Sequence, residues 1–249
     1  EGTAVDDFFN PDRIVVGGNN PLKLKKLKEL YKDFEAEIIT TDPISSQLIK
    51  YLSNTYLPLR LSFANEAARL VNSSGGNLDD VLKGVGMDSR IGQHYFRPSP
   101  AWGGSCFPKD VVEVNNFYDP NKVSLPLIAN IIESNKIQTE WTTNMLKSIH
   151  DEKKLDGIVL VGAAFKEDTD DLRNSPTLDI YTQLKDKNLN VKIYDELIDS
   201  KDFISTEDFE NLETPCLIAL MYPLKDDLML KINNIVTRTN SFLYTPWQI

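Results

Sequence analysis

The sequence predicts an α/β protein in which a long helical section separates two sections of alternating strands and helices. Near both ends of the chain, short apolar strand patterns alternate with helical patterns, which is typical of doubly wound parallel sheets. Between them, apolar residues stay dense from Asp42 to Val71 without a turn signal, which favours one helix of about 30 residues. We therefore divide the chain into residues 1–41, 42–151 and 152–249.

In the first section, strand patterns flank one helical pattern. Arg13 to Val16 has the pattern of a short buried strand and is followed by Gly17 and Gly18. Pro21 to Phe34 has the pattern of an amphipathic helix, and Glu37 to Thr40 has that of another strand.

The middle section begins with the long helix. Asp42 followed by Pro43 is a helix-start signal, and the run Asn72-Ser-Ser-Gly-Gly ends the helix. Pro58 lies inside it, and an interior proline removes a hydrogen bond, so we expect a bend near Tyr56. The helix is apolar beyond one face, and such an excess usually needs a partner. We therefore expect a two-fold homodimer through this helix.

The remaining elements follow in order. Asn77 to Lys83 favours a short helix, Gly84 to Ser105 is a loop rich in glycine and proline, and Leu125 to His150 favours another long helix. In the last section, Ser175 followed by a proline caps a helix that ends near Lys187. Buried strand patterns lie at Gly157 to Gly162, Asn190 to Tyr194 and Cys216 to Met221.

Composition narrows the class of function. A net charge of −10 argues against a nucleic-acid partner, because phosphate backbones are bound by basic surfaces. No apolar run approaches the ~20 residues of a membrane span and the first residues are not signal-like, so we expect no membrane partner and a cytoplasmic location. The cysteines form no disulfide framework, and neither His94 nor His150 has metal-ligand spacing, so we expect no metal site.

Gly103 to Asp110 reads Gly-Gly-Ser-Cys-Phe-Pro-Lys-Asp and places Cys106 in a glycine-flanked turn. The thiolate is the nucleophilic form of cysteine, and a neighbouring cation such as Lys109 favours it. Glycines also let a ligand approach the backbone. Cys216 instead lies in an apolar run, which is typical of a structural cysteine. Cys106 is therefore the candidate nucleophile, and an ordinary loop cysteine is the alternative.

Lys50 and Asn54 are four residues apart, so on a helix they project from one face and can reach the same ligand atom. The alternative is a lysine whose stem lies on apolar surface while its head stays in water. Asp110 lies four residues beyond Cys106, where it can act as a helix cap, and capping does not exclude a catalytic role.

Two clusters suit a phosphorylated ligand. One loop combines guanidinium groups, which pair with a diphosphate, with rings that suit the face of a base or sugar, although an ordinary charged loop is the alternative. Its members are Arg90, Tyr95, Arg97 and Trp102. In the second cluster, Lys166 and Arg173 follow a strand and precede a helix, so amides at the helix start would add to both cations around an anion. We interpret Asp195 as a strand-end residue.

Taken in order, these motifs resemble the UDP-glucose 6-dehydrogenases, a branch of the nucleotide-sugar dehydrogenase family. The resemblance covers most of the chain and runs through residues 1–7, 10–17, 50 with 54, 88–92, 103–110 and 165–176. The run Ser-Cys-Phe-Pro-Lys-Asp that begins at Ser105 is more similar to the UDP-glucose branch than to the GDP-mannose or N-acetylmannosamine branches.

The resemblance implies three parts in the fold. They are a remnant of an N-terminal NAD-binding Rossmann domain in residues 1–41, a central helical dimerisation region with the cysteine loop in 42–151, and a C-terminal Rossmann-like, UDP-sugar-binding domain in 152–249.

The same resemblance implies NAD-dependent oxidation of UDP-glucose to UDP-glucuronate through a thiohemiacetal and a thioester on Cys106. Lys50 and Asn54 would stabilise oxyanionic charge at C6, and Asp110 would order the hydrolytic water with Lys50. The implied substrate-binding residues are Glu1, Arg90 from the neighbouring subunit, Tyr95, Arg97, Trp102, Gly103, Phe165 and Lys166. The implied cofactor-binding residues are Glu1, Lys109 and Arg173.

The sequence also departs from the family pattern. It contains no Gly-x-Gly-x-x-Gly, so we expect that most of the NAD-binding domain is missing and that the isolated chain is inactive. Ser99 and Ala101 stand where family loops commonly place glycine, and the C-terminus lacks the substrate arginine that relatives usually carry. The alternative function is a truncated, non-catalytic module for nucleotide-sugar binding or dimerisation.

Overall fold

The computed structural model describes residues 4–117 and 123–246, so the predicted site residue Glu1 lies outside the described residues. Within these ranges, no helix has the length and apolarity needed to cross a membrane, and no group of three or more His, Cys, Asp or Glu side chains is placed to bind a metal ion.

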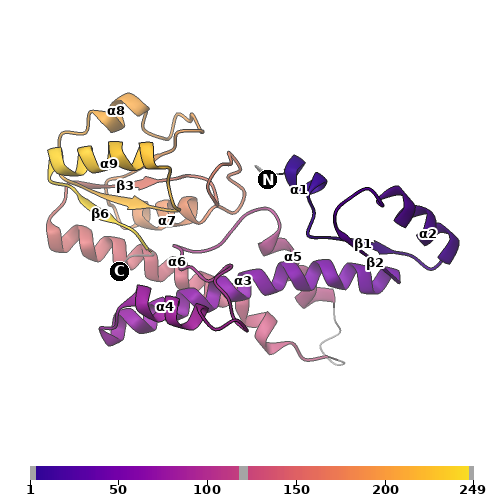
Figure 1. Cartoon of the computed structure of the whole chain (residues 1–249). Helices are drawn as coiled ribbons and strands as arrows, with labels where there is room; N and C mark the ends of the chain where they lie inside the picture. The colour runs from indigo at the N-terminus through magenta and orange to yellow at the C-terminus, as the bar shows by residue number, and fades with distance from the viewer. Residues whose placement is uncertain (1–3, 118–122, 247–249) are drawn as a thin grey trace.

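The N-terminal section is a β-α-β unit preceded by a short helix (Figure 1). Its elements are α1 (Ala4–Phe9), β1 (Arg13–Gly17), α2 (Pro21–Leu30) and β2 (Glu37–Thr41). The two strands pair in parallel, with Arg13 opposite Glu37. Asn20 caps α2 by accepting the backbone N–H groups of the second and third helical residues. The helix ends at Leu30 and not at Phe34 as predicted, because the chain turns at Tyr31 and the Phe34 ring packs near the Tyr31 ring.

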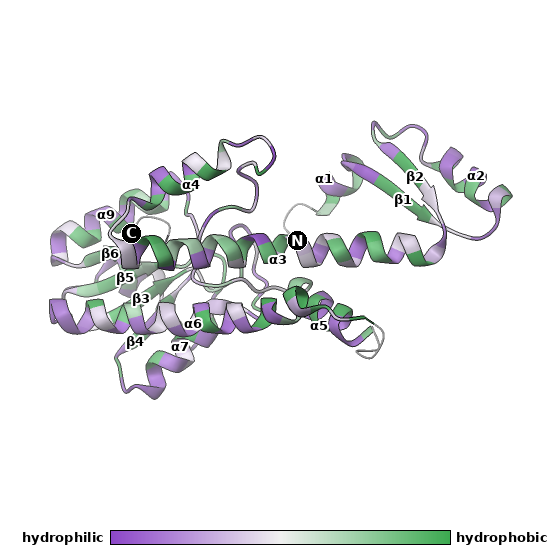
Figure 2. Cartoon of the chain, turned by 90° about the horizontal axis from the view of Figure 1, so that it is seen from below, coloured by the Kyte–Doolittle hydropathy of each residue, from purple (hydrophilic) through white to green (hydrophobic). Residues whose placement is uncertain are grey.

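The long helix that the sequence predicts is present as α3 (Pro43–Ser74). Asp42 caps its start by accepting the backbone N–H of Ser45 at 3.0 Å. Gly75 ends it in the left-handed conformation, with φ at 70°. The helix continues without interruption through Pro58 (Figure 2), and the bend near Tyr56 stays a prediction.

Further helices complete the middle section: α4 (Leu78–Gly86), α5 (Phe107–Phe117) and α6 (Pro126–Lys153). The sequence analysis did not predict α5. It packs between α3 and α6, and all three helices contact one another. Val111 on α5, Ile131 on α6 and the loop residue Trp102 form the buried centre of this packing. The loop that carries Cys106 is therefore attached to a rigid group of three helices.

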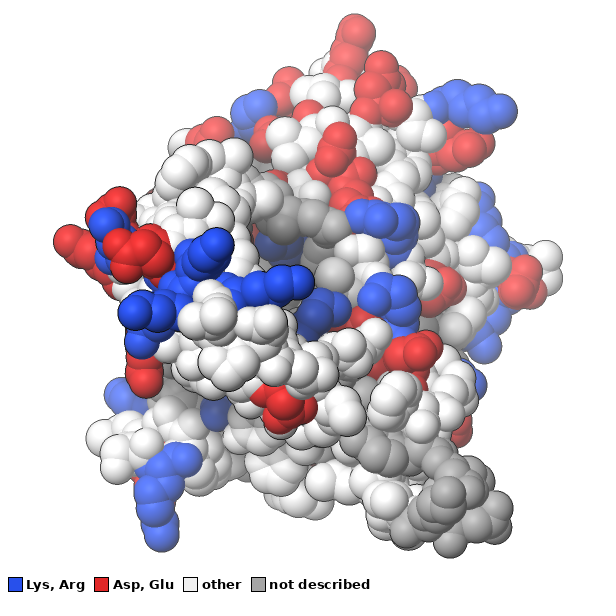
Figure 3. All heavy atoms as spheres, turned by 90° about the vertical axis from the view of Figure 1, so that its right-hand side faces the viewer, with Lys and Arg blue, Asp and Glu red and all other residues white. Residues whose placement is uncertain are grey.

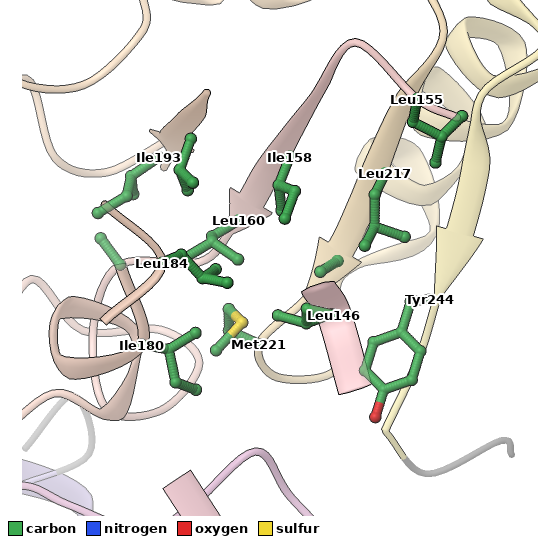
Figure 4. Close-up of a cluster of buried hydrophobic side chains, with 13 residues drawn as sticks. Leu146, Leu155, Ile158, Leu160, Ile180, Leu184, Ile193, Leu217, Met221 and Tyr244 are labelled. Atoms are coloured by element: carbon green, nitrogen blue, oxygen red, sulfur yellow. The ribbon is translucent and has the colours of Figure 1, made fainter. Parts of the chain in front are cut away.

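The C-terminal section is a parallel sheet with strand order β4-β3-β5-β6, covered by helices on both faces. Its elements are β3 (Gly157–Val161), α7 (Pro176–Asp186), β4 (Val191–Tyr194), α8 (Thr206–Glu210), β5 (Cys216–Leu220), α9 (Asp226–Thr239) and β6 (Phe242–Tyr244). On one face, Ile158 and Leu160 pack against α7 and against Leu146 of α6 (Figure 4). On the other face, Val159 and Val161 pack against α8 and α9.

The predicted fold class is confirmed, because both sheets are parallel and the C-terminal one is covered by helices on both faces. Cys216 is buried in β5, as expected for a structural cysteine. The boundaries at residues 41/42 and 151/152 stay predictions. Leu146 contributes to the core of the C-terminal sheet, so α6 belongs to the packing of both the middle and the C-terminal sections.

Candidate active site

A pocket of about 430 Å³ lies between the cysteine loop and the segments that follow β3 and β5. The chain brings to it two regions that are far apart in sequence, residues 95–107 and 165–167, together with residues 221–223. The predicted site residues that line the pocket are Tyr95, Arg97, Trp102, Gly103, Cys106, Phe165 and Lys166. The pocket therefore combines a thiol, cationic side chains and aromatic rings.

The two glycines before Cys106 are required by close packing against the C-terminal section. A Cβ on Gly103 would lie 1.9 Å from the backbone oxygen of Asn174. Gly104 has φ at +94°, and a Cβ there would lie 2.9 Å from the Phe165 ring. The side chain of Asn174 also donates to the carbonyl of Gly104 at 3.1 Å. These contacts hold the cysteine loop against the strand-end loop that carries Lys166.

Ser99 and Ala101, at positions where the family resemblance led us to expect glycine, do not strain the loop. Neither residue has a positive φ angle, so an L side chain is accommodated at both positions. Both residues line the pocket beside Trp102, whose side chain is buried.

Cys106 is exposed at the N-terminal end of α5, where its carbonyl accepts the backbone N–H of Asp110 at 2.9 Å. Its Sγ atom lies 3.6 Å from the hydroxyl oxygen of Ser105. Asp110 is thus inside the first turn of α5 and is not the cap of that helix. The thiol faces the pocket while the carboxylate, one helical turn further on, is buried.

The carboxylate of Asp110 joins the residues that the sequence analysis grouped with it. Its Oδ2 atom accepts a hydrogen bond from Asn54 Nδ2 at 2.7 Å and one from Lys50 Nζ at 3.2 Å. Its Oδ1 atom accepts from Lys109 Nζ. Burial by itself would raise the pKa of Asp110, but the hydrogen bonds from Lys109, Asn54 and Lys50 outweigh burial and hold the pKa below its usual value. The carboxylate is therefore ionised at neutral pH and orients both lysines.

Lys50 and Asn54 do not line the pocket that holds Cys106. They line a separate, wide groove between α3 and the segment from Asp7 to Val15. Its volume is about 910 Å³. Figure 3 shows lysine and arginine side chains beside a hollow on the side of the molecule that carries α2. Asp110 therefore connects the thiol pocket, through α5, to the groove along α3.

Two predicted site arginines do not line the thiol pocket. Arg90 forms an ion pair with Asp88 at 2.6 Å, and its side chain is 87% exposed. Arg173 forms an ion pair with Asp171 at 2.7 Å just before the start of α7, where Ser175 caps the helix. Both guanidinium groups are thus exposed and lie outside the pocket that holds Cys106.

The sequence analysis missed Tyr222 and a group of buried or half-buried polar residues on α6. The ring of Tyr222 lines the pocket, and its hydroxyl donates to Asp195 Oδ2 at 3.0 Å. The same carboxylate oxygen accepts the backbone N–H of Ala163 at 2.7 Å, so Asp195 is a structural strand-end residue as interpreted. The residues on α6 are Asn135, Gln138 and Thr142, which bond to the loop of residues 99–102. Polar residues in a long helix normally indicate a solvated face, so the sequence carried no signal for them.

The fold and the pocket together define a helical region joined to a Rossmann-like domain, with an exposed cysteine in the pocket between them. Comparison with known proteins identifies the class. Residues 44–137 match the central domain of the UDP-glucose/GDP-mannose dehydrogenase family, and residues 159–220 match its UDP binding domain. The chain belongs to this family.

Individual relatives agree with the family match. The UDP-glucose 6-dehydrogenase of Rickettsia prowazekii is 38% identical over 253 residues, which cover 100% of this chain and 57% of that protein. UDP-glucose 6-dehydrogenase TuaD of Bacillus subtilis is 34% identical over 197 residues, which cover 79% of this chain and 43% of that protein. The chain thus spans about half the length of the curated relatives it matches.

The structure of a UDP-glucose dehydrogenase from Pyrobaculum islandicum superimposes with a TM-score of 0.82 at 26% identity. The match covers 100% of this chain and 58% of that chain. The arrangement of the helical region and the Rossmann-like domain is therefore shared with a solved nucleotide-sugar dehydrogenase.

Proposed function

We propose that this chain forms the central and UDP-binding part of an NAD-dependent UDP-glucose 6-dehydrogenase, which oxidises UDP-glucose to UDP-glucuronate. The observation that carries this proposal is the pocket in which Cys106 lies with Lys166, Arg97 and aromatic rings. Cations and rings suit a nucleoside diphosphate, and a thiol suits covalent capture of an aldehyde. The match to a UDP binding domain over residues 159–220 supports the choice of nucleotide.

In this proposal the substrate spans the pocket. Lys166 and Arg97 neutralise the diphosphate, while Tyr95, Trp102 and Phe165 border the uridine and sugar. The backbone of Gly103, which lines the pocket, contacts the sugar. Arg90 is supplied by a second copy of the chain, in keeping with its place outside the pocket of its own chain.

The chain's own residues carry the acyl chemistry. The thiolate sulfur of Cys106 adds to the C6 aldehyde carbon, and the aldehyde oxygen takes the negative charge. Lys50 and Asn54 stabilise that charge, since Asp110 holds both donors together. After oxidation to the thioester, water attacks the carbonyl carbon, the C–S bond breaks, and sulfur leaves as the thiolate. Asp110 and Lys50 order that water.

The cofactor would supply the redox chemistry: two NAD molecules, bound in succession, would each accept one of the two hydrides that leave C6. The chemistry of the residues present fits a dinucleotide in part. Arg173 offers an exposed guanidinium beside the N-terminus of α7, an arrangement that suits a diphosphate. Lys109 supplies a second cation near Cys106, and Glu1 is the third predicted contact.

Isolated, this chain is expected to bind UDP-glucose weakly, and Lys166→Ala should weaken that binding. A hydrogen bond to a charged group contributes ~1.5–3 kcal/mol, which corresponds to a loss of about tenfold to a hundredfold in affinity. Titration calorimetry with UDP-glucose measures the effect, and Lys187→Ala, at the exposed end of α7, is the control. Absence of any binding heat at millimolar UDP-glucose would contradict the proposed function.

The chain is also expected to form a dimer through α3. Tyr56, Phe63 and Leu70 are 56%, 59% and 67% exposed and stand seven residues apart, so they form an apolar stripe on one side of the helix. Light scattering at micromolar concentration should give the mass of two chains, and Phe63→Asp should give one. The control is Leu230→Asp, which places the same charge on α9 at a side chain that is 64% exposed. A monomeric parent chain would rule out this interface.

A further inference from the structure

The pocket that holds Cys106, to which we assign the nucleotide sugar, is lined in part by a short loop, residues 99–102. This loop belongs to no helix or strand. Its backbone is instead bonded to side chains of α6. Asn135 pairs with both backbone groups of Trp102, accepting its N–H at 3.0 Å and donating to its carbonyl at 2.7 Å. Gln138 Nε2 donates to the carbonyl of Ser99 at 2.9 Å. Thr142 Oγ1 donates to the carbonyl of Pro100 at 2.8 Å.

These α6 residues act as one unit because of their spacing. They lie three and four residues apart, so all three project from the same face of the helix. Gln138 is 2% exposed and Thr142 is fully buried. Buried polar groups are costly unless they are hydrogen-bonded, and here the partners are carbonyl and N–H groups of the pocket loop.

Side chains of α3 also bond to the same loop. Asn65 Oδ1 accepts the backbone N–H of Ser99 at 2.8 Å, and the hydroxyl of Ser62 accepts from Trp102 Nε1 at 2.9 Å. Gln138 links the two helices, because its Oε1 atom accepts from Arg69 of α3 while its Nε2 atom donates to the loop. The conformation of the loop therefore depends on the positions of both α3 and α6.

We propose that Asn135, Gln138 and Thr142 are positioning residues of the nucleotide-sugar pocket. They act through the loop backbone, which sets where Trp102 and, a few residues later, Cys106 stand relative to Lys166 across the pocket. This inference rests on the proposed function, since it assigns the pocket to UDP-glucose. Without the side-chain bonds, a loop that lacks its own secondary structure samples other conformations, and ordering it again on binding lowers affinity.

Two neighbouring threonines allow a matched test. Thr142 and Thr143 are both fully buried on α6, but Thr143 Oγ1 donates to the carbonyl of Thr139 in its own helix and does not bond to the loop. Thr142→Val and Thr143→Val remove the same hydroxyl and keep the same shape. Thr142→Val should weaken UDP-glucose binding by about threefold to tenfold, Thr143→Val should not, and Thr142→Ser should restore it.

Gln138→Glu provides a second, independent variant. It keeps the acceptor for Arg69 but replaces the donor to Ser99 with a carboxylate oxygen, which repels the carbonyl. We expect about a tenfold weaker binding of UDP-glucose. Amide hydrogen exchange should also become faster within residues 99–102 in Gln138→Glu and Thr142→Val, and should be unchanged there in Thr143→Val.

The outcomes separate this inference from the proposed function. Equal affinities and equal loop exchange in Thr142→Val and Thr143→Val would overturn the positioning role. A parent chain that does not bind UDP-glucose would contradict the proposed function instead. In that case the hydrogen-exchange rates still test whether these α6 residues hold the loop. Equal exchange rates in Thr142→Val and Thr143→Val would show that they do not.

Discussion

We expect Cys106→Ser to lower the rate of UDP-glucuronate formation by about 10³-fold or more, as removal of a nucleophile does in other enzymes. The variant is made in an active enzyme that contains this chain together with an NAD-binding domain. A serine hydroxyl is not ionised near neutral pH, and a serine ester hydrolyses less readily than a thioester. The affinity for UDP-glucose should change little, because the hydroxyl replaces the thiol at the edge of the pocket without removing a cation or a ring. Product formation by chromatography and binding by calorimetry measure the two quantities.

The control for that variant is Cys216→Ala. Cys216 lies in β5, buried against the C-terminal core, and burial raises the pKa of its thiol. Its loss should lower thermal stability and leave the rate of acid formation at the parent level. An unchanged turnover in Cys106→Ser would remove Cys106 from the mechanism.

Local signals were sufficient for much of the fold. The pair Asp42 and Pro43 set the start of α3, and the glycine after Ser74 set its end within a few residues of the prediction. In the C-terminal sheet, β3, β4 and β5 were found because they are short apolar runs, whereas β6 was not predicted. α5 was missed because it follows directly on a glycine-rich loop and contains Pro108. α9 was missed although Leu228, Ile232 and Ile235 have helical spacing, so its pattern could have been found.

For the candidate site, whether a contact could be predicted depends on how far apart in the sequence the two contacting residues are. Lys50 and Asn54 could be grouped because one helix brings them together. Their joint partner, Asp110, is 60 and 56 residues away, and its bonds to them depend on how α5 packs against α3. The resemblance to a family, and not residue spacing, placed Lys166 with Cys106. No pattern in the sequence indicated that polar residues on α6 bond to the pocket loop, since that contact exists only after α6 and the loop have packed together.

Asp110→Asn is expected to reduce both activity and stability. In the active enzyme, loss of the carboxylate leaves Lys50 and Lys109 without their shared anionic partner, and we expect a fall in rate of about 10²–10⁴-fold, the range for a positioned acid–base group. The carboxylate is fully buried, so replacing it also removes charge-assisted hydrogen bonds worth ~1.5–3 kcal/mol. For a chain of this size that corresponds to a fall in melting temperature of roughly 3–12 °C at pH 7.

The pH dependence of this loss of stability distinguishes the contribution of the carboxylate's charge from the contribution of its shape. The pKa of Asp110 is lowered in the folded chain, so its contribution is fully present above the pKa of an unfolded aspartate, near 3.9, and is lost as pH falls through the lower, folded value. The difference in melting temperature between the parent and Asp110→Asn should therefore be largest near pH 7 and should shrink at pH 3 and below. Asp151→Asn is the control, because hydrogen bonds from Lys147 and His150 also lower the pKa of Asp151, but on the exposed surface, where solvent screens such a pair and it adds little stability. A difference for Asp110→Asn that stayed constant from pH 7 to pH 3 would mean that the ionised carboxylate does not stabilise the packing of α5 against α3.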